Sequence, residues 1–325
     1  AYILLFLFSS RYYQKSNKHI NFYLISVSIV ALYGIIQYFG LDPIPRDFMR
    51  YKWSGRAFST IGNPNFLGAY LVLALPIFMF LYIHLKKSIL LFITLLTFFC
   101  LLCTSSRGAW IGFFISVVTL VYYVHKLQYS RKHLLLTLGF MVAITILFNL
   151  YNDNAFLNRL LSIFGDMNKV VVQTPDLEEA GSSRIFIWTR VLEMIKNKPL
   201  WGVGLETLDM AFLDNYKSDI INYFGREVFI DKAHNEYLHI AVTTGIPSLI
   251  AFLAFLVNIV WKGFKQIKNN YLVLPLFCSI LGYLAQAFFN ISVVSVAPIF
   301  WIFLGILSKF TDETKKIPVY NTNEP

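Results

Sequence analysis

Long apolar stretches alternate with short polar connections along most of the chain. Eight stretches approach the roughly 20 residues that an α-helix needs to cross a bilayer. Each is bounded by charge, Gly, Pro or Asn: Ile20–Phe39, Phe66–His84, Ser88–Cys103, Gly108–Val124, His133–Leu150, Pro247–Trp261, Tyr271–Phe289 and Val294–Phe310. A backbone in hydrocarbon must satisfy its own hydrogen bonds, and the sequence lacks the alternation of a membrane barrel, so these stretches predict helices. The short apolar run Ala1–Ser9 is expected to be the end of a helix whose beginning is missing.

The composition agrees with a membrane protein. Of the 325 residues, 57% are hydrophobic and only 14% are charged, whereas a soluble domain carries about 25% charged residues. A soluble globule and a disordered chain are therefore both excluded. The three cysteines all fall in apolar runs, so no disulfide framework is expected.

The distribution of Lys and Arg predicts the orientation of the helices. The connections 10–19, 85–87, 125–133, 262–270 and 309–325 hold 14 Lys and Arg in 48 residues. The alternate connections 40–65, 104–107, 151–246 and 290–293 hold 14 in 130 residues. Positive charge favours the cytoplasmic side, so the first set is predicted to be cytoplasmic and the second to face outward. The net charge of +10 is then mostly a topology signal, and no nucleic-acid partner is expected.

The fold class that follows is all-α: a polytopic transmembrane helix bundle of about eight full spans plus an N-terminal partial span, with one large extracytoplasmic, partly helical loop. Residues 1–150 would form the partial first span and five full spans. Residues 151–246 would form the large outer loop with the catalytic candidates. Residues 247–310 would form three C-terminal spans, and residues 311–325 a cytoplasmic tail.

The large outer loop shows local helix signals. Ser182-Ser183 before 184–197 predicts a capped amphipathic helix that ends before Pro199. Arg184 and Trp188 are one turn apart on one face of that helix. A Gly-rich turn follows at 199–204, and a second helix is expected from about residue 232 to 244, ending at Gly245. The segment 165–183 is interpreted as a flexible lid or linker.

The other outer connections carry unexpected arginines. The first one holds four basic residues on the side where positive charge is disfavoured: Arg46, Arg50, Lys52 and Arg56. They suit either lipid headgroups or an anion site. Ser105 and Arg107 lie in a very short turn between two spans, which favours an oxyanion or phosphate ligand over a snorkelling side chain.

Two polar turns complete the set of candidates. Asn63 and Asn65 flank a proline at the start of a predicted span, where Asn63 can cap the helix and both can serve a site. His234, with Asn235 and Tyr237, opens the helix that leads to Gly245. An outward histidine can act as a base near neutral pH, or it can be structural. His239 lies on another face and is given a structural role. The sequence shows no metal-ligand spacing and no nucleotide fingerprint, so no metal or cofactor is expected.

These residues together resemble a known family, the O-antigen ligases and polymerases with the related bacterial O-oligosaccharyltransferases. Gly62-Asn63-Pro64-Asn65 resembles that family's outer turn, and Ser105-Ser106-Arg107-Gly108 resembles its arginine turn. Arg184 with Trp188 and the turn at 199–204 is similar to the start of its large outer loop. Its ligase pattern is His, then Asn, Ser or Gln, nine residues and Gly. Here it is His234-Asn235, nine residues and Gly245. The resemblance runs from about residue 58 to 310, although family members usually have ten to twelve spans.

The resemblance implies a membrane enzyme of the bacterial cytoplasmic membrane that transfers an oligosaccharide from undecaprenyl pyrophosphate to a glycan or glycolipid acceptor on the outer face. His234, Arg184 and Arg107 would be catalytic. Substrate binding would fall to Arg56, Asn63, Asn65, Ser105, Trp188, Asn235 and Tyr237. Without acidic metal ligands, arginine charge would stabilise the leaving pyrophosphate, and direct displacement would invert the anomeric centre.

Other functions stay open at this point. The acceptor separates a ligase from a polymerase, which extends another lipid-linked repeat, and from an O-oligosaccharyltransferase acting on protein. A lipid-linked glycan transporter or flippase is a second class. The interiors of the eight stretches lack Asp, Glu, Lys and Arg, which argues against ion-coupled transport. A membrane scaffold or sensor is a third class, and it would not explain the outward arginines.

Overall fold

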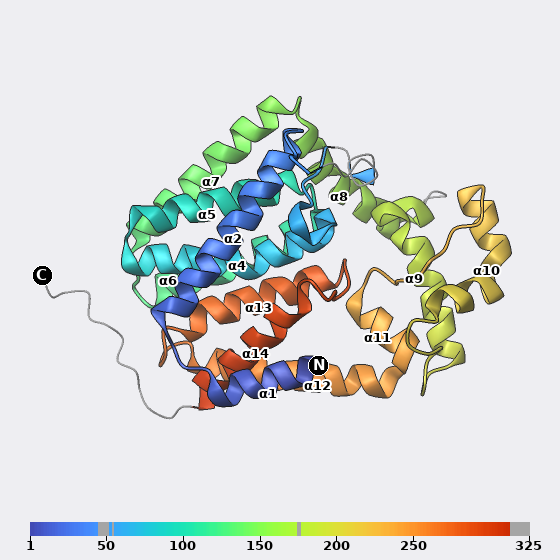
Figure 1. Cartoon of the computed structure of the whole chain (residues 1–325). Coiled ribbons are helices and arrows are strands. Elements are labelled where there is room, and N and C mark those ends of the chain that lie inside the picture. Colours follow the sequence, from blue (N-terminus) through green and yellow to red (C-terminus); the bar gives the residue numbers. More distant parts are fainter. Residues whose placement is uncertain (45–51, 54, 174–176, 313–325) are drawn as a thin grey trace, which may run out of the picture. The chain divides into compact units, whose positions relative to one another are not determined.

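The computed structural model describes residues 1–44, 52–53, 55–173 and 177–312. Within these ranges the chain forms 13 α-helices and two short 3-10 helices, and no strand (Figure 1). The expected all-α class is therefore confirmed for the described part of the chain.

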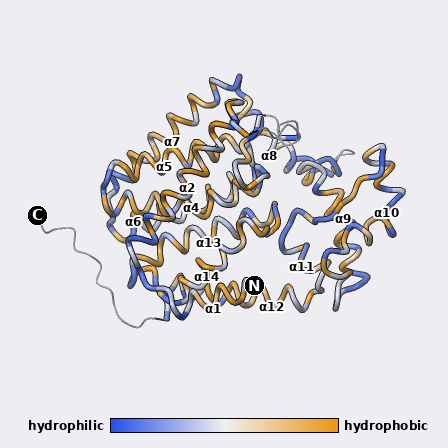
Figure 2. The backbone as a smooth tube through the Cα atoms, in the orientation of Figure 1, coloured by the Kyte–Doolittle hydropathy of each residue, from blue (hydrophilic) through white to orange (hydrophobic). Residues whose placement is uncertain are grey.

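Every predicted apolar stretch forms a helix. The helices are α2 (Asn17–Tyr38), α4 (Pro64–Leu85), α5 (Ser88–Cys103), α6 (Arg107–Lys126), α7 (Arg131–Tyr151), α12 (Ile246–Gln266), α13 (Val273–Ala287) and α14 (Ala297–Asp312). Five of them, α2, α4, α6, α7 and α12, are long and apolar enough to cross a membrane, whereas α5 and α13 are shorter apolar helices. Figure 2 shows hydrophobic colour along these helices and hydrophilic colour at their connections. The count of eight spans stays a prediction.

The chain divides into two compact units. The first, here called the bundle unit, contains the described residues of 1–157, 259–286 and 293–325. The second, the loop unit, contains the described residues of 158–258 and 287–292. Each unit has its own packed interior and is described by itself.

Helix α4 is the centre of the bundle unit. It contacts α2, α5, α6 and α7, and 83% of its most apolar window is buried, against 22% for α2 and for α7. A helix that is apolar on all sides is stable only when it is enclosed. Close approach of backbones adds to the packing: a Cβ on Gly112 of α6 would lie 2.4 Å from the carbonyl oxygen of Gly282 in α13. The Ser279 hydroxyl also donates to the Leu73 carbonyl of α4.

Helix α1 (Tyr2–Tyr12) lies along α14 within the bundle unit (Figure 1). The contact is close because α14 has a glycine there. A Cβ on Gly305 would lie 2.6 Å from the Phe6 carbonyl oxygen. The short linker that follows, residues 13–16, leads into α2, whose first turn is capped by Ser16.

The loop unit is built from α9 (Ala180–Asn197), α10 (Leu208–Phe224) and α11 (Glu236–Thr244). Its apolar core is formed by Phe186 and Val191 of α9, Phe212 of α10 and Val242 of α11, among other residues. Tyr223 stacks on Phe186 with the ring centroids 4.3 Å apart. This core fixes the three helices that carry or support the segment of His234.

Two helices of the large loop differ from the expectation. The segment 165–183 is partly helical: α8 (Ala155–Val172) runs through its first part, and residues 174–176 lie outside the described residues. Although α9 is assigned from Ala180, residues 181–183 have left-handed φ between +61° and +67°, so its regular helical turns begin at Arg184, as expected. The apolar side chains of α8 recur at helical spacing, but the many polar residues between them make this pattern hard to recognise in the sequence. Helix α10 was also not expected, although Gly225 ends it in the left-handed conformation that glycine favours.

Candidate active site

The bundle-unit candidates gather where α4 and α6 begin. A Cβ on Gly68 of α4 would lie 2.6 Å from the Cβ of Ala109 in α6, so the first turns of the two helices are in close contact. Asn63 precedes α4 and Arg107 is the first residue of α6. The N-termini of helices present backbone N–H groups and partial positive charge. This end of the bundle unit is therefore suited to an anion.

Asn63, Asn65 and Arg56 form a continuous hydrogen-bonded arrangement. The Asn63 amide oxygen accepts from the Asn65 backbone N–H at 2.8 Å, which confirms the expected cap of α4. The Asn65 amide oxygen accepts from the Arg56 guanidinium at 2.9 Å, and the same guanidinium donates to the Thr104 carbonyl at 2.9 Å. The second asparagine thus holds an arginine in place. Of the other basic residues in this loop, Arg46 and Arg50 lie outside the described residues.

The turn before α6 is held in an unusual backbone conformation. Ser105 has φ of +49°, and the Thr104 hydroxyl accepts from the Ser106 backbone N–H at 3.3 Å. The Ala57 N–H also donates to the Cys103 carbonyl, which joins this turn to the segment that carries Arg56. Arg107 is half-buried. The sequence suggests a catalytic role for Arg107 and a substrate-binding role for Arg56, and the structure places their segments side by side.

His234 and Arg184 lie in the loop unit, where the charge of Arg184 acts on the imidazole. His234 is exposed and its φ is +51°, a left-handed conformation that is uncommon for residues other than glycine. Its pKa is lowered from 6.5, first because the surrounding protein reduces hydration of the charged form and second because Arg184 is positive. Asp231 acts in the opposite direction. The imidazole is consequently neutral at pH 7 and available to accept a proton.

Trp188 and Tyr237 support the segment around His234. The Trp188 indole N–H donates to the carbonyl of Ala233 at 2.9 Å, which ties α9 to the residue before the histidine. The rings of Trp188 and Tyr237 both contact Phe288, with centroids 5.6 and 6.5 Å away. Burial raises the pKa of Tyr237 to about 12, so its hydroxyl stays protonated and can donate a hydrogen bond.

Asn235 and Gly245 mark the two ends of α11, and the nine residues between them are the helix itself. The buried Asn235 side chain accepts from the Leu238 N–H at 3.0 Å and so caps the helix. At the other end, a Cβ on Gly245 would lie 2.0 Å from the Leu200 carbonyl oxygen. Only glycine fits that contact, and its φ is +91°. The spacing of the motif is therefore the length of one short helix.

The Gly-rich turn at 199–204 packs against the end of α11. The N–H groups of Val203 and Gly204 donate to the carbonyls of Val242 and Thr243 at 2.8 and 3.0 Å. A Cβ on Gly202 would lie 2.5 Å from the Val242 carbonyl oxygen. The glycines thus serve backbone contact.

Sequence reasoning missed Glu236, Phe288 and Thr104. The Glu236 carboxylate accepts from the Ser292 backbone N–H at 2.5 Å, and burial raises its pKa from 4.5. An acidic residue in the first turn of a helix was a visible signal for Glu236. No local pattern announces Phe288 or Thr104, because their partners are distant in the sequence.

The predicted site residues thus form two groups. Arg56, Asn63, Asn65, Ser105 and Arg107 belong to the bundle unit, and Arg184, Trp188, His234, Asn235 and Tyr237 belong to the loop unit. Within the described residues, no cluster of three or more His, Cys, Asp or Glu side chains could hold a metal ion.

The apolar helices indicate a helical, multi-pass membrane protein, and comparisons with known sequences relate its central part to a known family. The sequence model of the O-antigen ligase family matches residues 92–253, so the chain contains an O-antigen ligase region. The matched range includes α6 and α9, the helices of Arg107 and Arg184, and the whole of α11.

Individual relatives agree with the family. The chain is 27% identical over 238 residues to a general O-oligosaccharyltransferase of Acinetobacter baylyi, covering 69% of this chain and 39% of the relative. It is 25% identical over 239 residues to a ComP-specific O-oligosaccharyltransferase of the same organism, covering 70% and 39%. A Rickettsia felis protein named as a candidate polysaccharide ligase is 34% identical over 94 residues, covering 28% and 22%. The chain spans about two fifths of the length of the first two relatives. These similarities support an enzyme of glycan transfer.

Proposed function

We propose that this protein transfers an oligosaccharide from undecaprenyl pyrophosphate to a glycan or glycolipid acceptor at the outer face of the bacterial cytoplasmic membrane. The observation that carries the proposal is that the exposed His234 and Arg184, whose charge acts on its imidazole, both lie inside the matched O-antigen ligase region. A base and a fixed cation are the two groups that such a displacement needs.

The reaction forms one bond and breaks one. The acceptor oxygen attacks the anomeric carbon, the bond between that carbon and the pyrophosphate oxygen breaks, and the electron pair leaves with undecaprenyl pyrophosphate. The hydroxyl proton passes to the unprotonated ring nitrogen of the neutral His234 imidazole. Because the nucleophile approaches opposite the leaving group, the anomeric configuration inverts.

The arginines stabilise the negative charge that grows on the leaving pyrophosphate. A guanidinium presents a planar set of donors that matches phosphate oxygens. In the loop unit this role falls to Arg184. In the bundle unit, Arg107 and the hydrogen-bonded Arg56 favour binding of an anionic donor at the start of α4 and α6. Ser105, Asn63 and Trp188 are proposed to assist in substrate binding, with the protonated Tyr237 hydroxyl as a donor to a sugar oxygen.

Release of undecaprenyl pyrophosphate tests the proposal. The purified chain in detergent is given an undecaprenyl-pyrophosphate oligosaccharide and candidate acceptors, with EDTA present, and the product is followed by mass spectrometry. We expect release by the wild type. His234→Ala should reduce the rate by about 10²-fold or more, since a general base contributes 10²–10⁴-fold. Arg184→Ala should cost a similar factor.

Two exposed residues supply matched controls. His125→Ala and Arg226→Ala remove the same side-chain types from positions outside the proposed site, and both should retain wild-type release. Full activity of His234→Ala would refute the base role. Absence of release by the folded wild type with every acceptor would favour lipid-linked glycan transport instead.

A protein acceptor is the second candidate. It is favoured by the two relatives that match over 69% and 70% of this chain, both named O-oligosaccharyltransferases. The hydroxyl of Ser or Thr would then take the place of the sugar hydroxyl, with the same base and the same leaving group. Supplying a Ser-rich peptide as the sole acceptor in the same assay separates the two: a glycosylated peptide supports the protein acceptor.

A further inference from the structure

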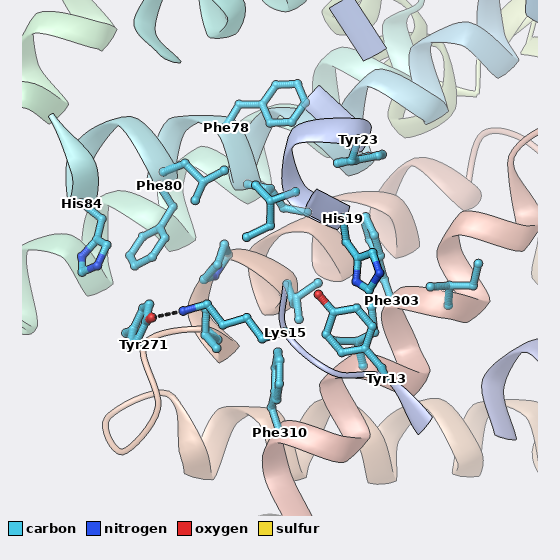
Figure 3. A pocket seen from close by; sticks show the side chains of 18 of the residues that line it. Tyr13, Lys15, His19, Tyr23, Phe78, Phe80, His84, Tyr271, Phe303 and Phe310 are labelled. Carbon is cyan, nitrogen blue, oxygen red and sulfur yellow. Dashed lines mark hydrogen bonds between the residues drawn. The ribbon is translucent and has the colours of Figure 1, made fainter. Parts of the chain in front are cut away.

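The bundle unit contains a cavity of about 270 Å³ at the end where α4 finishes. Helices α2, α4, α13 and α14 and the linker before α2 contribute its walls. Figure 3 shows the aromatic side chains that face it, among them Tyr23, Phe78 and Phe303. The rest of the lining is mainly Ile and Leu. Such a wall suits an alkyl chain and not a soluble metabolite.

The cavity is remote from the candidate active site. His84, one of its lining residues, is near the C-terminal end of α4, whereas Asn63 and Asn65 are at the other end of that helix. A helix of 22 residues is about 33 Å long, which is close to the thickness of a bilayer's hydrocarbon core. The cavity and the arginine-bearing turns therefore lie at opposite ends of the span.

Besides three tyrosines, the polar residues of the lining are cationic or can become so: Lys15, His19 and His84. None of the described residues that line the cavity is acidic. The Lys15 ammonium donates to the Tyr271 hydroxyl and lies 4.9 Å from the centroid of that ring (Figure 3). The His84 ring stacks on the ring of Tyr271, with the two centroids 4.9 Å apart. A lysine is thus held at the edge of an apolar cavity.

The surroundings reinforce this positive charge. The described helix ends and connections near this end hold Arg11, Lys86 and Lys87, which are exposed. The N-terminus of α2 begins next to Lys15 and adds the partial positive charge of the helix dipole. A basic pocket between spans at the cytoplasmic side is a recognised setting for acidic lipid headgroups.

We propose that this cavity is a binding site for an anionic phospholipid of the inner leaflet, with an acyl chain among the aromatic side chains and the phosphate at Lys15 and His19. An acyl chain that moves from the bilayer into the cavity exchanges one apolar environment for another, so the chain gives little selectivity. The charge of the headgroup must therefore supply the selectivity between lipids. The site therefore distinguishes anionic from zwitterionic lipids through Lys15, and it is independent of the proposed transfer reaction.

Lipid binding to the purified full chain tests this inference. Phosphatidylglycerol and phosphatidylcholine are each titrated into the protein in non-ionic detergent, and binding is measured by native mass spectrometry. Inorganic phosphate is titrated in a separate experiment, and its effect is measured by thermal shift. One phosphatidylglycerol should bind at least about fivefold more tightly than phosphatidylcholine, since one basic residue near an anionic group is worth about that factor. Inorganic phosphate alone should produce no stabilisation.

Three variants locate the site. Lys15→Gln should weaken phosphatidylglycerol binding about fivefold, whereas Lys18→Gln, three residues away and outside the lining, should leave it unchanged. Ile302→Trp should fill the cavity and abolish the selective binding. If that variant fails to fold, the Lys15 and Lys18 pair decides the question. Equal binding of both lipids, an unaltered affinity in Lys15→Gln, or equally strong binding of free phosphate would each overturn the proposal.

Discussion

Single side chains in the loop unit show how the fold keeps histidines neutral. His234 is exposed, yet reduced hydration and the charge of Arg184 lower its pKa. His239 is half-buried on another face of the same segment, and burial, followed by the charge of Lys232, lowers its pKa to about 4. The first histidine can therefore meet a substrate more readily than the second. The chemical role of one and the structural role of the other stay predictions.

Removing the charge of Arg184 should raise the pKa of His234. In Arg184→Gln the coulombic contribution to the shift is lost, while the contribution from burial remains, so the pKa should move up toward 6.5 without reaching it. NMR titration of protein labelled in its histidines measures this without any substrate. Arg226→Gln is the control and should leave the pKa as in the wild type. An unchanged value in Arg184→Gln would mean that the two side chains do not interact.

His239 should make the loop unit less stable in mild acid. Its folded-state pKa of about 4 lies below the unfolded value of 6.5. The free energy of unfolding is therefore unaffected by His239 above pH 6.5 and falls as the pH drops toward 4, because the unfolded state binds a proton that the folded state does not. At pH 5 the loss is of order 2 kcal/mol. Thermal denaturation in detergent at pH 7 and pH 5 tests it. The drop in Tm should be smaller for His239→Gln than for the wild type, and equal drops would contradict the assignment.

At the scale of elements, α11 explains why a histidine, an asparagine and a distant glycine recur at fixed spacing. Asn235 begins the helix, Gly245 ends it against the backbone of Leu200, and His234 sits directly before the cap. A longer or shorter helix would separate the histidine from this contact. The glycine is therefore required by geometry, although it lies far along the chain from the proposed chemistry.

Gly245→Ala should damage the loop unit far more than Gly225→Ala. Both glycines have positive φ, at +91° and +69°, so alanine is strained at either position. At Gly225 no heavy atom lies within 4 Å of the added Cβ, whereas at Gly245 the Cβ would be 2.0 Å from the Leu200 carbonyl oxygen. We expect about 1 kcal/mol of destabilisation for Gly225→Ala and a larger Tm loss for Gly245→Ala. Similar Tm values for the two variants would refute the close contact.

The sequence predicts apolar helices well and amphipathic ones unevenly: the helix expected over 184–197 is present and ends at Asn197, whereas two others were missed. The bounds of α5 follow directly from its uninterrupted apolar run, Ser88–Cys103. Helices α8 and α10 mix polar and apolar residues at a period that is visible only when one face is considered. The start of α11 was expected four residues too early, because the cap at Asn235 is the true beginning.

At the scale of the whole molecule, the sequence indicates which residues matter but not what they contact. The Arg56 guanidinium meets the Thr104 carbonyl across 48 positions, and the Trp188 indole meets the Ala233 carbonyl across 45. Such pairs depend on helix packing, which local patterns do not contain. The orientation can be predicted from the sequence, because the prediction uses the density of charged residues along the chain and requires no knowledge of contacts.

Labelling of single cysteines tests that orientation. The native Cys100, Cys103 and Cys278 are buried, so they should remain silent toward a membrane-impermeant maleimide. Asp214→Cys, exposed in the loop unit, should be labelled in intact spheroplasts. Gln128→Cys, in the basic connection 125–133, should be labelled only after permeabilisation. The reverse pattern would invert the proposed topology.

The hydrogen bond from Trp188 to Ala233 also makes the tryptophan a spectroscopic probe of the His234 segment. The indole N–H donates to the carbonyl of the residue before His234, and the indole ring contacts Phe288 edge to face. The chain has six tryptophans, so incorporation of a fluorinated analogue gives a small set of signals, and Trp188→Phe identifies the relevant one. Occupation of the neighbourhood of His234 by a saccharide should displace that resonance, which provides a way to detect acceptors before turnover occurs.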